Sequence, residues 1–259
     1  MEKWKIGARE FHSRLMLGTG KYRTFEEMRA CLEASGAEII TVALRRLDLS
    51  HPQQRGLLDF IDQSRYTILP NTAGCKTVQE AVQTARLAAA MGLPRWVKLE
   101  VIPDAKYLLP DPLATLEATK LLAEEGFDVL PYCNADPVLC LRLQEAGAAT
   151  VMPLGSPIGS GQGVPNLHQI QIIIEQARVP VIVDAGLGVP SDAALAMEAG
   201  ASACLVNTAI AQAQNPVQMA QAMKLGIEAG RAAYLAGRIP RLAHATASSP
   251  AVGLPHVGG

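Results

Sequence analysis

The sequence predicts an α/β fold: a single-domain (β/α)8 TIM barrel followed by an irregular C-terminal tail. Three observations support this prediction. Eight short apolar segments recur along the chain, alanine-rich amphipathic segments lie between them, and 259 residues is a typical length for one such barrel. The composition is 49% hydrophobic but only 4% aromatic, so the core must be built mainly from Ala, Val, Ile and Leu. Parallel strands covered by helices have that kind of core.

The eight predicted strands begin 22 to 32 residues apart, which is the space that a strand, a helix and two loops require. Alternating strands and helices form right-handed parallel crossovers, and eight of them close most simply into a barrel. An open doubly wound sheet is the alternative, but it usually has a glycine-rich phosphate loop after its first strand. Gly18-Thr19-Gly20 is too short a match to support that alternative. The predicted strands cover residues 15–17, 39–44, 67–69, 96–101, 128–132, 150–154, 179–183 and 203–206.

The predicted helices carry start and stop signals. Thr24, three residues before Glu27, and Ser191, directly after Pro190, are expected N-caps. The periodicity stops after residue 239, so we expect the barrel to span residues 1–239 and the tail residues 240–259. Amphipathic patterns cover residues 77–91, 113–125, 137–146 and 191–199, and several helices should end at glycine, namely Gly36, Gly92, Gly126, Gly147 and Gly200.

Charge and cysteine usage exclude several classes of protein. A net charge of −1 argues against a large nucleic-acid interface. The five cysteines are scattered without a Cys-x-x-Cys pair, and the five histidines show no ligand spacing, so neither a disulfide framework nor a metal site is expected. Neither a signal segment nor a run of about 18 apolar residues is present, which predicts a cytoplasmic protein that does not enter the membrane.

Lys98 lies inside the apolar strand of residues 96–101, and Glu100 follows two residues later. Alternate residues of a strand share a face, so both side chains should point into the barrel, with Val97 and Leu99 pointing outward. A buried lysine must be paired, neutral or reactive. Two interpretations stay open: an ion pair with Glu100 or Asp184, or a Schiff-base nucleophile that attacks a ketone. A neutral nucleophile requires those carboxylates to be distant, protonated or used as proton shuttles.

Other polar residues follow the predicted strands, where barrel enzymes place their active sites. The loop of residues 155–163 contains four glycines, whose backbone amides can cradle an anion. Together with Asp184-Ala185-Gly186 and Asn207-Thr208, this loop predicts a phosphate-binding cup. Three roles stay open for Arg45-Arg46: binding a phosphate, contacting a neighbouring subunit, or lying in solvent.

Eight motifs lie in order along nearly the whole chain, and their combination is highly specific. They are residues 42–46 (VALRR), 69–75 (LPNTAGC), 97–101 (VKLEV), 157–163 (PIGSGQG), 183–186 (VDAG), 206–211 (VNTAIA), 236–240 (AGRIP) and 247–250 (ASSP). Together these motifs resemble the bacterial thiazole synthase family of thiamin biosynthesis.

The resemblance implies a sulfur-incorporating transferase that builds the thiazole phosphate carboxylate. Its substrates would be 1-deoxy-D-xylulose 5-phosphate, dehydroglycine (2-iminoacetate) and sulfur from the thiocarboxylate of a sulfur carrier protein. Lys98 would form the imine with the ketose, and Glu100 and Asp184 would act as acid and base. The sugar-phosphate contacts would be Gly159, Ala185, Gly186, Asn207 and Thr208.

The resemblance also implies a homotetramer that needs no metal or organic cofactor and docks the carrier protein. It does not say whether a glycine oxidase or a tyrosine lyase supplies dehydroglycine, nor where the carrier docks. Two rival functions are another Schiff-base phosphosugar aldolase of the same fold and a non-catalytic phosphosugar-binding barrel. In the second rival, Lys98 would be only a structural ion pair.

Overall fold

A computed structural model of the chain describes residues 2–46 and 56–248, and in this part eight parallel strands form a barrel. Strand pairing follows the order β8-β7-β6-β5-β4-β3-β10-β9, and the Val151–Val181 and Leu154–Asp184 bridges close the ring. The predicted barrel is therefore confirmed, and the open sheet is wrong. The strands are β3 (Leu15–Gly18), β4 (Ile39–Ala43), β5 (Thr67–Asn71), β6 (Trp96–Leu99), β7 (Asp128–Cys133), β8 (Met152–Pro153), β9 (Ile182–Asp184) and β10 (Ala203–Val206).

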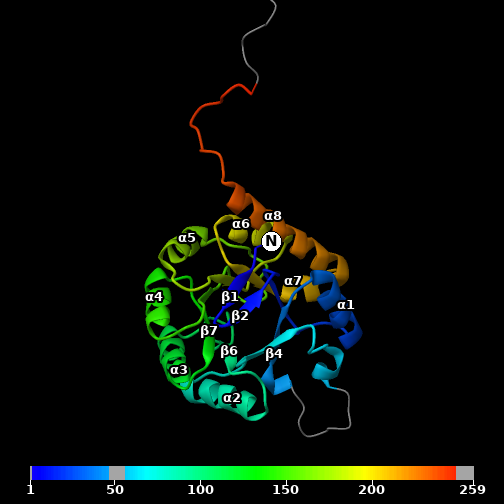
Figure 1. Ribbon diagram of the computed structural model, residues 1–259, viewed down its shortest axis with the longest axis vertical. Helices are drawn as coiled ribbons and strands as arrows, with labels where there is room; N and C mark the ends of the chain where they lie inside the picture. The colour runs from blue at the N-terminus through cyan, green and yellow to red at the C-terminus, as the bar shows by residue number, and fades with distance from the viewer. Residues whose placement is uncertain (1, 47–55, 249–259) are drawn as a thin grey trace, which may run out of the picture.

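Helices surround the barrel (Figure 1), and the long helix α8 packs against α6 and α1. Two short 3-10 helices, η1 (Leu44–Arg46) and η2 (Leu57–Phe60), lie between β4 and β5. The four helices predicted by range are all present within one residue at either end. The helices are α1 (Phe25–Ser35), α2 (Val78–Ala90), α3 (Pro112–Glu124), α4 (Pro137–Glu145), α5 (Leu167–Gln176), α6 (Pro190–Glu198), α7 (Thr208–Ala211) and α8 (Pro216–Ala236).

Of the two predicted helix N-caps, the one at α1 is confirmed and the one at α6 is wrong. Thr24 caps α1, because its hydroxyl accepts the N–H of Glu27 at 3.1 Å. The prediction for Ser191 is wrong, because Val189 occupies the N-cap of α6. Proline at the next position has no N–H to be capped, and the Asp192 carboxylate accepts the N–H of Val189 at 3.1 Å instead.

Strand β6 shows the predicted alternation of faces. Val97, Leu99 and Val101 point outward, are fully buried, and pack against alanines and leucines of α2 and α3. Burying each such side chain stabilises the fold by about 1.5–3 kcal/mol. Lys98 and Glu100 therefore have to point into the barrel.

A two-stranded hairpin that the sequence analysis did not predict closes the amino-terminal end of the barrel. Strands β1 (Trp4–Ile6) and β2 (Arg9–Phe11) pair antiparallel and cross the middle of the ring (Figure 1). The hairpin's apolar side chains belong to the same buried cluster as Trp96 and Leu130 of the barrel floor. The rings of Phe11 and Trp96 stack with centroids 6.2 Å apart.

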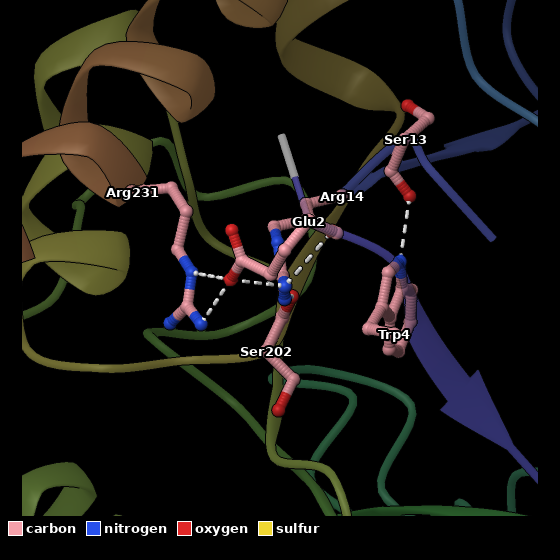
Figure 2. Close-up of polar contacts among 6 residues, drawn as sticks. All are labelled: Glu2, Trp4, Ser13, Arg14, Ser202 and Arg231. Atoms are coloured by element: carbon pink, nitrogen blue, oxygen red, sulfur yellow. Dashed lines mark hydrogen bonds and ion pairs between the residues drawn. The ribbon is translucent and has the colours of Figure 1, made fainter. Parts of the chain in front are cut away.

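A buried arginine fastens this hairpin to the barrel. Arg14, only 3% exposed, donates to the carbonyl of Ser202 at 2.6 Å and to the Glu2 carboxylate at 2.8 Å (Figure 2). Arg231 of α8 binds the same Glu2 oxygen from the other side, its Nε at 2.8 Å. Trp4 completes the closure, because its indole N–H donates to the carbonyl of Ser13 at 2.9 Å.

The chain after α8 has no helix or strand over residues 237–248 and leaves the barrel in one direction (Figure 1). The rest of the predicted tail, residues 249–259, lies outside the described residues, so the division at residue 239 stays a prediction. No helix in the described ranges is long and apolar enough to cross a membrane.

Candidate active site

A cavity of about 910 Å³ lies at the carboxyl end of the barrel strands, where the sequence placed the site. Its wall follows the alternation of the strands, so every second residue faces inward. From β4 and its continuation these are Thr41, Ala43 and Arg45. The eight predicted site residues all line this cavity, namely Lys98, Glu100, Gly159, Asp184, Ala185, Gly186, Asn207 and Thr208. Their chemical roles stay predictions.

Lys98 is at the centre of a buried charge cluster. Its Nζ lies 2.6 Å from Oδ2 of Asp184 and 3.2 Å from Oε1 of Glu100, and all three side chains are at most 7% exposed. Its Nζ also lies 5.6 Å from the ring centroid of Tyr132. A neutral Lys98 requires the carboxylates to be distant, protonated or used as proton shuttles. These distances exclude the first condition, so the carboxylates must be protonated or must shuttle protons.

The surroundings shift the pKa values of both Lys98 and Asp184. Burial favours the neutral amine of Lys98, but the charges of Asp184 and Glu100 together outweigh burial and raise its pKa. Burial likewise raises the pKa of Asp184, against the opposing effect of Lys98. With two carboxylates facing one ammonium, the fully ionised cluster would carry an excess negative charge in a buried site. A proton shared between Lys98 and Asp184 relieves this excess.

Strand register and hydrogen bonds of the Thr72 hydroxyl fix the height of these groups in the barrel. The Cα of Asn71 in β5 is in register with that of Lys98 in β6. The Thr72 hydroxyl then accepts the N–H of Glu100 and donates to its carbonyl, both at 2.8 Å. Thr72 thus holds the residue just after β6, and Glu100 remains beside Lys98 although the regular strand ends at Leu99.

The glycine-rich loop after β8 and the turn after β9 meet at the cavity wall. Gly186 has φ +76°, and a Cβ at this position would collide with the hydroxyl and backbone of Ser156. Ala185, with φ +70°, is one of three described non-glycine residues with positive φ. A left-handed alanine costs about 1–2 kcal/mol, which the surrounding loops must offset. Backbone groups of residues 155–163 and 184–186 are therefore held close together.

Asn207 links the last strand to the first. With its amide oriented to donate, Nδ2 reaches the carbonyls of Gly18 at 3.1 Å and Gly20 at 2.9 Å. A Cβ on Gly18 would approach that of Asn207 to 2.6 Å, so only glycine fits there. The Gly18-Thr19-Gly20 segment, set aside as evidence for an open sheet, thus belongs to the wall of this cavity.

Lys21 is a cavity residue that the sequence analysis missed. It has φ +66°, and its Nζ lies 3.3 Å from where a Cβ on Gly159 would be. The side chain of Lys21, which follows β3, therefore brings a positive charge to the glycine-rich loop that follows β8. The only available signal was its place directly after Gly18-Thr19-Gly20, at the end of the first barrel strand.

Of the two neighbouring arginines, Arg45 lines the cavity, whereas the side chain of Arg46 lies outside the described part of the structure. The guanidinium of Arg45 lies against Gly74, where it occupies the place that a Cβ would take. As for metals, no three His, Cys, Asp or Glu side chains converge anywhere in the described ranges.

Comparisons with known proteins agree with this architecture. The model of the family described as "Thiazole biosynthesis protein ThiG" matches residues 5–250. A thiazole synthase of Acaryochloris marina (strain MBIC 11017) is 59% identical over 258 residues, which is 97% of this chain and 94% of that protein. A bifunctional protein ThiO/ThiG of Trichormus variabilis (strain ATCC 29413 / PCC 7937) is 58% identical over 254 residues, covering 96% of this chain and 39% of that protein.

A solved structure resembles the chain in fold as well as in sequence. A chain from the crystal structure of the Amycolatopsis orientalis BexX/CysO complex superposes with a TM-score of 0.84 at 35% identity. The match covers 94% of this chain and all of that one. Because the family model and relatives near 60% identity span almost the entire sequence, the chain belongs to the thiazole synthase family of thiamin biosynthesis.

Proposed function

We propose that the protein condenses 1-deoxy-D-xylulose 5-phosphate, 2-iminoacetate and sulfur from a carrier-protein thiocarboxylate into the thiazole phosphate carboxylate. The observation that carries this proposal is the buried amine of Lys98 at the cavity floor, with two carboxylates within 3.2 Å. A primary amine in such a place can attack the ketone at C2 of the sugar and form an imine with loss of water.

The carboxylates supply the proton transfers that this chemistry needs. The raised pKa of Lys98 keeps the resting amine protonated, so a proton must leave before attack. Asp184, at 2.6 Å, is placed to take it, and burial favours the protonated form of its carboxyl. The cationic imine then acidifies the proton at C3, and Glu100 or Asp184 can remove it as the carbonyl moves from C2 to C3. Sulfur enters at C3.

The phosphate of the sugar is assigned to the cup formed by Gly159, Ala185, Gly186, Asn207 and Thr208. Positive-φ glycines let backbone amides approach an anion without side-chain obstruction. Lys21 adds a cation at the same place, with its Nζ near Gly159. This arrangement holds the sugar by its phosphate while its ketone reaches Lys98.

The sulfur donor is proposed to be a small carrier protein that docks over the open mouth of the barrel. The relative solved as a BexX/CysO complex supports a protein partner for this fold. The bifunctional ThiO/ThiG relative supports a close link to a second enzyme, as expected if a labile imine is handed over directly. A homotetramer in the cytoplasm, free of nucleic acid and membrane, completes the proposal.

Reductive trapping tests the function. The protein is incubated with 1-deoxy-D-xylulose 5-phosphate and reduced with borohydride, and peptides are mapped by mass spectrometry. We expect the sugar's mass increment on Lys98 and none in Lys98→Ala. A sugar that binds without labelling Lys98 would favour the non-catalytic barrel. Added carrier thiocarboxylate and 2-iminoacetate should then give a sulfur-containing ring, whereas an aldolase would cleave a carbon–carbon bond and ignore the sulfur donor.

A further inference from the structure

The cavity has positive groups at two separate places on its mouth. Lys21 lies beside Gly159 in the loop after β8, and Arg45 follows β4. Gly159 lies against Thr208, which follows β10, and β10 is two strands from β4 in the closed ring. A ligand whose phosphate occupies the cup therefore leaves the Arg45 side of the cavity open for another anion.

The strand registers give the height of Arg45 relative to Lys98. Ala43 is in register with Asn71, and Asn71 is in register with Lys98, so these three positions lie at one level of the barrel. Arg45 is two residues further along, which puts its backbone about 4–7 Å nearer the mouth. It thus stands above the level of the reactive amine rather than outside the barrel.

The guanidinium of Arg45 packs directly against Gly74. This glycine has φ +95°, and a Cβ there would take the place of the Arg45 Nη1 atom. The packing directs the planar group across the third loop at the cavity wall. An arginine held in this way can bind a carboxylate through two parallel N–H donors.

No carboxylate of the described residues pairs with Arg45. Three acidic residues line the cavity: Glu100 and Asp184 both pair with Lys98, and Asp104 is engaged by its own loop. The Asp104 carboxylate accepts the N–H of Lys106 at 2.9 Å and that of Tyr107 at 3.2 Å. Within the described residues, the guanidinium therefore keeps N–H donors for an anion that comes from solution.

We propose that Arg45, seated on Gly74, binds the carboxylate of the second small substrate, a two-carbon α-imino carboxylate. This proposal rests on the proposed function, and it assigns a binding residue to the imine, a substrate that had none. A cavity of about 910 Å³ is in the range that holds drug-sized ligands, so an imino acid fits beside a five-carbon sugar phosphate. The phosphate and the carboxylate then bind at separate places on the cavity wall, and the reacting carbons lie near Lys98.

The test measures three KM values in Arg45→Gln. The imine is generated in solution from glyoxylate and ammonia, with the sugar phosphate and the carrier thiocarboxylate as co-substrates. Loss of a charge-assisted hydrogen-bonded pair should raise KM for the imine about 10- to 100-fold. KM for the sugar phosphate and for the carrier should stay within about twofold. Arg45→Lys should recover part of the loss, because lysine keeps the charge but not the two-pronged geometry.

Two further variants sharpen this test. Gly74→Ala keeps the arginine but displaces its flexible end, and should give the same selective rise in KM for the imine. Lys106→Gln removes an exposed cation of the neighbouring loop, whose Nζ lies over the ring of Tyr107, and should change none of the three values.

Borohydride trapping with the sugar phosphate separates this proposal from the proposed function. Equal labelling of Lys98 in the wild type and in Arg45→Gln would show that imine formation is intact in the variant. The KM values then test the role of Arg45. An unchanged KM for the imine would then overturn the role of Arg45 alone. A rise confined to the carrier would assign Arg45 to the carrier's C-terminal thiocarboxylate instead, and would also overturn it. An unlabelled wild-type protein would overturn the proposed function and this proposal with it.

Discussion

Both ends of the barrel bury a cation next to carboxylate oxygen, but the two cations are held differently. At the closed end, Arg14 donates to a backbone carbonyl and to Glu2, and lies beside the ring of Trp4 (Figure 2). At the open end, Lys98 contacts two titratable carboxylates and faces the cavity. The exposed fractions are nearly equal, 3% for Arg14 and 6% for Lys98.

This difference shows that burial of a charge does not by itself mark an active site. Burial lowers the pKa of Arg14, yet a guanidinium stays protonated in proteins, and its partners fix its position. The amine of Lys98 can lose its proton, and both of its partners can accept one. The Lys98 cluster can exchange protons with a ligand in the open cavity, whereas Arg14, held by its partners, only fixes the hairpin to the barrel.

The largest expected effect separates the two ends directly. Lys98→Ala should lower turnover by about four orders of magnitude or more, because the imine cannot form. The single-turnover rate with all three substrates measures this, and circular dichroism checks that the barrel persists. Turnover that survives in a less stable protein would reduce Lys98 to a structural ion pair.

At the closed end the opposite result is expected. Arg14→Met should lower the free energy of unfolding by about 3 kcal/mol, because it removes the buried guanidinium that donates to the Ser202 carbonyl and to Glu2. Turnover per folded molecule should not change. Urea titration and active-site labelling measure the two quantities. The control is Lys3→Met, which removes an exposed pair with Glu10 and should leave the free energy of unfolding nearly unchanged. A loss of turnover in folded Arg14→Met would mean that the two ends are coupled.

The charge balance at the open end predicts a pH effect. In the wild type, Asp184 and Glu100 raise the pKa of Lys98, so the rate of imine trapping should increase with pH as the amine loses its proton. Asp184→Asn removes the strongest of the influences that raise this pKa, while burial continues to lower it. The rising limb of trapping rate against pH should therefore move to lower pH. A limb that stays in place, or moves upward, would show that Asp184 does not set the protonation of Lys98.

The smallest effect concerns the phosphate cup. Lys21→Gln should raise KM for the sugar phosphate about tenfold, with little change in turnover at saturation, because it removes one cation from an anion site. Arg23→Gln is the matched control, since Arg23 pairs with Glu27 at the surface and does not line the cavity. Equal KM values for the two variants would show that Lys21 does not contribute to binding the sugar phosphate.

The sequence by itself determined the barrel and the level of its active site. Eight apolar segments at regular spacing can bury their outward faces only under the intervening helices, so the strands were predictable from pattern alone. A period of two placed Lys98 and Glu100 on one face of β6. The glycine-rich loop of residues 155–163 was recognisable because its composition suits close backbone approach to an anion.

Only the tertiary structure decided which distant residues meet. Ring closure brings Asp184 of β9 within 2.6 Å of Lys98 on β6, and it brings Lys21 to Gly159. The β1–β2 hairpin escaped prediction because its strands are three residues long and alternate with charges, as exposed segments do. Its apolar side chains are buried only because the barrel offers an open floor. Contacts between segments distant in sequence form only when the barrel closes, so the local hydrophobic periodicity of the sequence cannot predict them.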